Sequence, residues 1–207
     1  MSTLLVVNSS PRANSVSRRL TKHVAAQWKQ HNPDGRVIER DLNVTPPSHL
    51  SEAWITATYT PADQRAAEQQ AILTESDTLI AELMAADLIV IGAPMHNFSI
   101  SGPLKAWIDQ IVRAGKTFSY SDKGPKGLLP EDKQVLVIVS RGGAYEDGSP
   151  ADFQVPYLRH MLRFVGLNNL TVIDADKQAF GPEAAQKSID DAIAKLSQCQ
   201  EHLAVPA

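Results

Sequence analysis

The chain has 207 residues, of which 43% are hydrophobic and 21% charged, a composition typical of a folded globular protein. Its formal net charge of -3 and its scattered basic residues argue against nucleic-acid binding, which usually requires a basic face. The single cysteine, Cys199, excludes an intrachain disulfide and a cysteine-based metal centre. No apolar stretch resembles a signal peptide or a membrane span, so we expect a cytoplasmic protein, one domain over residues 1–207, and no membrane or metal partner.

In the first third of the chain, apolar runs alternate with a helical pattern. The run at residues 3–8 is almost continuously apolar, which is typical of a strand covered by helices on both faces. Residues 20–28 carry an apolar residue at every fourth position and predict a helix. The more polar run at residues 36–41 indicates an edge strand. Residues 43–67 are too long for a plain connection, and such insertions usually serve function or an interface.

The rest of the chain continues this alternation. We predict further strands at 87–92, 134–140 and 170–174, and further helices at 68–84, 104–112, 158–165 and 189–203. The connection at 117–133, which contains Gly124-Pro125-Lys126-Gly127, is expected to be mobile. Alternation of strands and helices predicts an α/β fold with a parallel sheet and helices on both faces. Five strands favour the flavodoxin-like three-layer sandwich with strand order 2-1-3-4-5.

In such a sheet, ligands bind outside the carboxyl ends of the strands, where the strand order reverses. The first loop at that edge, NSSPRANSVSRRL, is rich in hydroxyl groups and leads directly into a helix. Free N–H groups and the helix dipole attract phosphate there, although the serines could simply cap the helix. The loop contains no glycine, so it matches neither a P-loop nor a dinucleotide fingerprint, and a monophosphate is the natural ligand.

Two further loops reach the same edge. Residues 95–98, Met-His-Asn-Phe, could present backbone and amide groups to a flat heterocycle, or could serve packing alone. Gly142 and Gly143 follow a buried strand, and their N–H groups could face an electron-rich edge or form a plain turn. Taken together, the three loops predict a mononucleotide with a flat base, of which FMN is the obvious case.

The segments SSPRANSVSRRL, APMHNFSISGPLKAWIDQIVRAGKTFSY, GPKGLL and VIVSRGGAY resemble the FMN-dependent NADH-azoreductase (NADH:quinone oxidoreductase) family, and the resemblance covers essentially the whole chain. In that family the second loop usually reads Pro-Met-Tyr-Asn-Phe, and His96 takes the tyrosine position here. The resemblance implies FMN contacts at Ser10, Ser15, Val16, Ser17, Met95, His96, Asn97, Phe98, Ser140, Arg141, Gly142 and Gly143.

The resemblance also implies an activity. FMN would take electrons from NADH or NADPH and deliver them to quinones and azo compounds in a ping-pong reaction, in a homodimer with the FMN sites at the interface. The expected acceptor pocket is lined by Phe98, Phe118, Tyr120 and Phe164. No acid–base side chain is expected to be essential; His96 is the one candidate proton donor, or an inert replacement of the tyrosine.

Two other functions compete with this interpretation. A flavodoxin-type electron carrier without its own NAD(P)H turnover would share the fold, but such carriers are more acidic and lack long insertions. A hydrolase would need an activated nucleophile or a metal site, and neither a G-x-S-x-G nor an H-E-x-x-H motif occurs.

Overall fold

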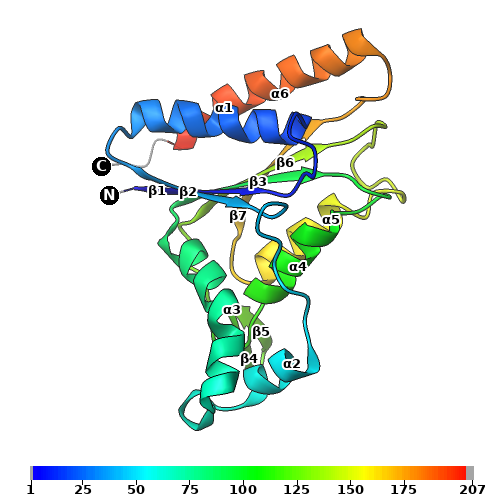
Figure 1. Cartoon of the computed structure of the whole chain (residues 1–207). Coiled ribbons are helices and arrows are strands. Elements are labelled where there is room, and N and C mark those ends of the chain that lie inside the picture. The colour runs from blue at the N-terminus through cyan, green and yellow to red at the C-terminus, as the bar shows by residue number, and fades with distance from the viewer. Residues whose placement is uncertain (1, 204–207) are drawn as a thin grey trace.

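The computed structural model describes residues 2–203, and its centre is a five-stranded sheet (Figure 1). All strand pairs of this sheet are parallel, and the strand order is β2-β1-β3-β6-β7. Counted along the chain, this is the predicted order 2-1-3-4-5. The strands are β1 (Thr3–Asn8), β2 (Arg36–Asp41), β3 (Leu88–Pro94), β6 (Gln134–Ser140) and β7 (Asn169–Ala175).

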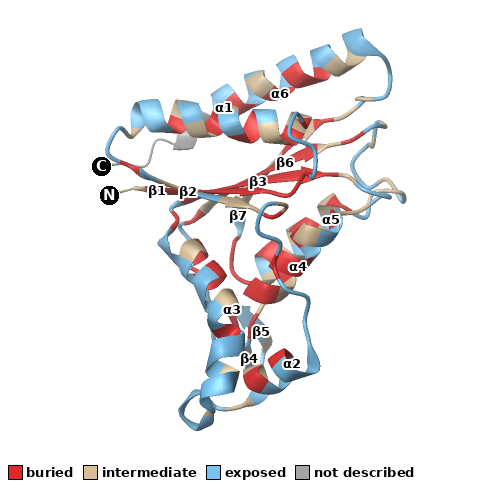
Figure 2. Cartoon of the chain, viewed as in Figure 1, coloured by how far each residue is buried: buried red, intermediate tan, exposed pale blue. Residues whose placement is uncertain are grey.

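Two helical layers cover the sheet (Figure 1). One layer consists of α1 (Val16–His31) and α6 (Pro182–Leu203), and the other of α3 (Ala67–Ala85), α4 (Gly102–Ile111) and α5 (Val155–Phe164). Because strand residues alternate between faces, each strand contributes to two separate cores. In β1, for example, Leu4 and Val6 pack with α1 and α6, whereas Leu5 and Val7 pack with the other layer. Burial on both faces explains the almost continuous apolar runs, as the buried sheet in Figure 2 illustrates.

The insertion at residues 43–67 folds into α2 (Glu52–Tyr59) and the short 3-10 helix η1 (Ala62–Gln64). Trp54 of α2 is buried, and its indole N–H donates to Gln110 Oε1 of α4 at 3.0 Å. The Gln110 amide in turn donates to the carbonyl of Ser48 at 2.9 Å. The insertion is therefore anchored to the helical layer at its beginning and along α2.

The connection at residues 117–133 contains an antiparallel hairpin of β4 (Phe118–Ser121) and β5 (Gly124–Gly127), two strands that were not predicted from the sequence. Two contacts attach it to the segment after α5. Leu129 N–H donates to the carbonyl of Val165, and Gly127 lies so close to Gly166 that a Cβ on Gly127 would come within 2.2 Å of the Gly166 nitrogen. Strands of four residues are too short to show a clear period-two pattern in the sequence.

No helix within residues 2–203 combines the length and hydropathy that a bilayer span requires.

Candidate functional site

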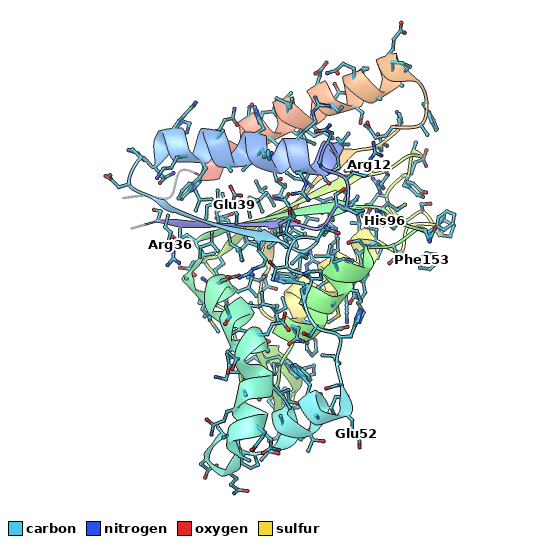
Figure 3. The ribbon with its side chains drawn as sticks, in the orientation of Figure 1. Arg12, Arg36, Glu39, Glu52, His96 and Phe153 are labelled. Carbon is cyan, nitrogen blue, oxygen red and sulfur yellow. The ribbon has the colours of Figure 1, made fainter. Side chains whose placement is uncertain are left out.

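A cavity of about 370 Å³ opens at the carboxyl ends of the parallel strands. Its volume lies in the range of small-molecule sites. It is lined by Ser10, Arg12, Ser15, Val16, Pro94, Met95, His96, Ser140, Arg141, Gly142, Gln178 and Ala179. Figure 3 shows Arg12 and His96 at this end of the sheet, with Phe153 nearby. The three predicted loops therefore meet at one cavity, joined by residues 178 and 179 from the loop after β7.

The first loop ends at the N-terminus of α1. Ser15 is the N-cap residue, and its Oγ accepts a hydrogen bond from the Arg18 N–H at 3.2 Å. The N–H groups of Val16 and Ser17 have no acceptor within the described chain. The Ser17 hydroxyl is buried and lies 3.4 Å from that of Ser15. Two unpaired N–H groups and a capping hydroxyl at a helix N-terminus make a suitable phosphate site.

An ion pair fixes the backbone of this first loop. The Arg18 guanidinium donates to both oxygens of Asp41 at the end of β2, and also to the carbonyl of Ser10 at 2.8 Å. The hydrogen bond from Arg18 lowers the pKa of Asp41 below its ordinary value, so the carboxylate is charged at neutral pH. Arg18 is occupied in this way and does not line the cavity, whereas Arg12 of the same loop lines it and forms no ion pair within residues 2–203.

The second loop is a tight turn with unusual backbone angles. His96 and Ser99 exchange N–H···O=C hydrogen bonds of 2.9 and 3.1 Å, and the two central residues, Asn97 and Phe98, have φ of +48° and +68°. Two positive φ values in a two-residue turn correspond to type I′, which rarely contains phenylalanine. The N–H groups of Asn97 and Phe98 find no acceptor in the part of the chain that the structure describes, and both residues are exposed.

The third loop is held by its carbonyl groups and by the Arg141 N–H, which donates to the carbonyl of Ala175 at 3.2 Å, and it leaves the N–H groups of its two glycines unpaired. The carbonyls of Arg141, Gly142 and Gly143 accept from the N–H groups of residues 178, 179 and 177 at 3.1, 3.0 and 2.9 Å. Neither glycine N–H donates to an acceptor among residues 2–203. Gly142 lines the cavity, and Gly143 is the next residue along the same loop. The glycine pair can therefore donate to an electron-rich edge.

The structure distributes the predicted contact residues unevenly. Eight of them line the cavity, and Asn97, Gly143 and the buried Ser17 are each next to a lining residue in the sequence. Phe98 lies two residues beyond the lining residue His96. The Arg141 guanidinium is also buried, in ion pairs with Asp152 and Asp174. The loop after β7, with Gln178 and Ala179, was missed, although the same strand-end rule that located the other loops would have included it.

The remaining predicted acceptor residues lie elsewhere. Phe118, Tyr120 and Phe164 form one aromatic cluster, with ring centroids 4.7 Å apart for Phe118 and Phe164 and 5.4 Å for Phe118 and Tyr120. Phe164 is the last residue of α5. The first residue of α5 lies near the cavity, because the preceding Gln154 side chain donates to the carbonyl of Ala93 at 2.9 Å, next to the lining residue Pro94. Ten helical residues span about 15 Å. A single chain therefore does not bring this cluster into the cavity.

These features fit FMN. The α1 N-terminus suits its phosphate, while the unpaired N–H groups of residues 97, 98, 142 and 143 suit the hydrogen-bond acceptors on the edges of its ring. When bound, FMN would supply two-electron hydride chemistry that amino-acid side chains do not perform.

Comparisons with known proteins agree with this geometry. Residues 2–199 match the model of the family described as having a flavodoxin-like fold. The chain is 47% identical over 193 residues to an FMN-dependent NADH:quinone oxidoreductase of Herminiimonas arsenicoxydans, covering 91% of this chain and 94% of that protein. It is 46% identical over 198 residues to FMN-dependent NADH:quinone oxidoreductase 1 of Jannaschia sp. (strain CCS1), covering 95% and 100%.

A solved structure supports the same relationship. The crystal structure of an azoreductase from Bacillus anthracis str. Sterne superimposes with a TM-score of 0.87 at 28% identity, covering 96% of this chain and 98% of that one. Both the family and the fold that the sequence predicted are thus confirmed. The chain belongs to the FMN-dependent NADH:quinone oxidoreductase and azoreductase family, with a flavodoxin-like fold.

Proposed function

We propose that this protein is an FMN-dependent oxidoreductase that uses NADH to reduce quinones, and azo compounds as further acceptors. The observation that carries the proposal is a cavity at the carboxyl edge of the sheet that is lined by three loops, each of which contains unpaired N–H groups. The names of the relatives, which specify FMN, NADH and quinone, support the same assignment.

In this proposal each loop has one task. Ser10, Ser15, Val16 and Ser17 hold the phosphate, and Arg12 adds positive charge beside it. The turn that begins at His96 lies along the ring. The N–H groups of Gly142 and Gly143 stabilise negative charge that develops at the pyrimidine edge, as donors fixed in advance in an oxyanion site do.

We further propose a ping-pong reaction, in which NADH and the acceptor occupy the same place in turn. No acid–base side chain is assigned an essential role. His96 lines the cavity and is exposed, so its imidazole can reach a bound reactant, and it is the candidate proton donor.

A homodimer would explain the separated aromatic cluster. Tyr120 is largely exposed on the β4–β5 hairpin, and Phe118 and Phe164 lie behind it. In a dimer, the cluster of one protomer can cover the cavity of its partner and complete an acceptor pocket with Phe98. Size-exclusion chromatography with light scattering tests the dimer, and Tyr120→Ala should then raise the KM for quinone without weakening FMN binding.

The activity is tested with the purified protein and FMN under anaerobic conditions. NADH should bleach the flavin absorbance near 450 nm, and a benzoquinone should restore it; parallel lines in double-reciprocal plots would support the ping-pong order. A protein that binds FMN but is not bleached by NADH would instead be an electron carrier, which is the alternative function. Absence of FMN binding would refute both.

A further inference from the structure

Arg141 is the most deeply buried charged group at the cavity. Its side chain is 3% exposed, and its Nη1 donates to Asp152 at 3.0 Å while its Nη2 donates to Asp174. The ring of Tyr145 lies under the guanidinium, 5.1 Å from its carbon to the ring centroid. Only Nε lacks a partner in the described chain. Two of its five N–H donors are used in these ion pairs, which fix the orientation of the guanidinium between the two carboxylates.

The two carboxylates belong to different elements. Asp174 lies in the last part of β7, and Asp152 precedes α5. Asp152 Oδ1 accepts from the N–H groups of Gln154 and Val155 at 2.9 and 3.0 Å, which fixes the beginning of α5. Arg141 itself directly follows β6. One guanidinium therefore joins the ends of β6 and β7 to the start of α5.

The glycine loop and the turn at Phe98 both adjoin the residues that these ion pairs join. Gly142 and Gly143, with their unpaired N–H groups, directly follow Arg141. On the other side, the N–H of Phe153, next to Asp152, donates to the carbonyl of Phe98 at 3.1 Å. That carbonyl belongs to the residue with φ of +68°, a conformation that persists only where its surroundings hold it. The ion pairs of Arg141 thus reach the glycine pair directly and the Phe98 turn through one hydrogen bond.

We propose that Arg141 is a positioning residue for the flavin ring, rather than a ligand of it. Its two ion pairs set the places of the glycine N–H groups and of the Phe98 turn, so the ring enters a site whose edges are already fixed. The inference rests on the proposed FMN site. Breaking either ion pair should loosen the ring site while leaving the phosphate site at α1 intact.

The test uses Asp152→Asn and Asp174→Asn. In Asp152→Asn, the amide oxygen still caps α5, while the amide nitrogen replaces the oxygen that accepts from Arg141 and cannot accept. Loss of comparable outer-shell partners at metal sites costs about 10–100-fold in affinity. We expect the Kd for FMN, measured by quenching of flavin fluorescence, to rise about tenfold in each variant. The Kd for riboflavin, which lacks the phosphate, should rise by the same factor.

Asp77→Asn is the matched control. Asp77 is 48% exposed and pairs at 2.7 Å with Arg113, whose side chain is 2% exposed, whereas Asp174 is 40% exposed beside Arg141. The Arg113 pair joins α3 to the end of α4, away from the cavity. Asp77→Asn should lower the unfolding temperature and leave the Kd for FMN unchanged.

The outcomes separate the possible roles. If Arg141 bound the flavin directly, removing its carboxylate partners would free the guanidinium, and FMN would bind equally well or more tightly; this result overturns the proposal. A lower unfolding temperature with an unchanged Kd in Asp174→Asn also overturns it, because the role would then be stability alone. If Asp152→Asn does not fold, the Kd for FMN of Asp174→Asn decides between these roles, because Asp174 is half-exposed and its replacement perturbs the fold less. Wild-type protein that binds no FMN would refute the proposed function instead.

Discussion

The N-cap of α1 offers a sharp test of the phosphate site. Ser15 Oγ accepts from the Arg18 N–H at 3.2 Å, and its own proton can still be donated to a phosphate oxygen. Replacing Ser15 with Ala therefore removes two interactions. Loss of the cap should lower the free energy of unfolding by about 1 kcal/mol. Loss of one hydrogen bond to a charged group costs about 1.5–3 kcal/mol, so the Kd for FMN should rise at least about tenfold.

The structure provides a matched control for Ser15→Ala. Ser51 caps α2 in the same way, since its Oγ accepts from the Trp54 N–H, also at 3.2 Å, and it lies outside the cavity. Urea unfolding should show a similar loss of stability in Ser15→Ala and Ser51→Ala. Fluorescence titration should show weaker FMN binding only in Ser15→Ala, and unchanged riboflavin binding in both variants. An equal effect on riboflavin and FMN, or an unchanged Kd for FMN, would refute the phosphate assignment.

Three further predictions concern stability and acceptor binding. Burial raises the pKa of Tyr157 to about 12 from the ordinary 10, so the stability that the neutral phenol contributes is complete below pH 10 and is lost as the pH rises towards 12. Urea unfolding at pH 9 and pH 11 should therefore show a smaller drop in the free energy of unfolding for Tyr157→Phe than for wild type. Gly127→Ala would push a methyl group against the Gly166 backbone and should destabilise the protein by about 1–3 kcal/mol. An unchanged unfolding temperature would contradict this expectation. Phe153 is exposed, and its N–H donates to the carbonyl of Phe98. Phe153→Ala should therefore raise the KM for a benzoquinone about fivefold, whereas an unchanged KM would place the acceptor elsewhere.

The sheet and its helices were predictable because burial on both faces leaves a direct mark on the sequence. Runs such as residues 134–140 have to be continuously apolar when helices cover both sides, and the strand order then follows from connectivity and the number of strands. The edge strand at residues 36–41 was equally visible, since its residues are only partly buried. By contrast, the β4–β5 hairpin depends on the close approach of Gly127 to Gly166, a long-range contact with no local pattern.

The site was predictable to the level of loops and not to the level of side-chain roles. Serine-rich and glycine-containing segments at strand ends indicated which backbone groups could meet a ligand. Whether a charged side chain faces the ligand depends on its partners, and those of Arg141 lie 11 and 33 residues further along the chain. The same limit applies to Phe153, which becomes a neighbour of Phe98 only through a backbone hydrogen bond across 55 residues of chain.

The hydrogen bonds between residues 141–143 and 177–179 involve main-chain groups alone. The length of the 177–179 segment is therefore fixed, because one inserted residue would shift the pairing of all three carbonyls and displace the wall of the cavity that they support. Its residues are constrained as well, since Lys177 has a φ of +56° and residues 178 and 179 line the cavity. For engineering, the exposed turn at residues 146–148 is the better place to lengthen the chain.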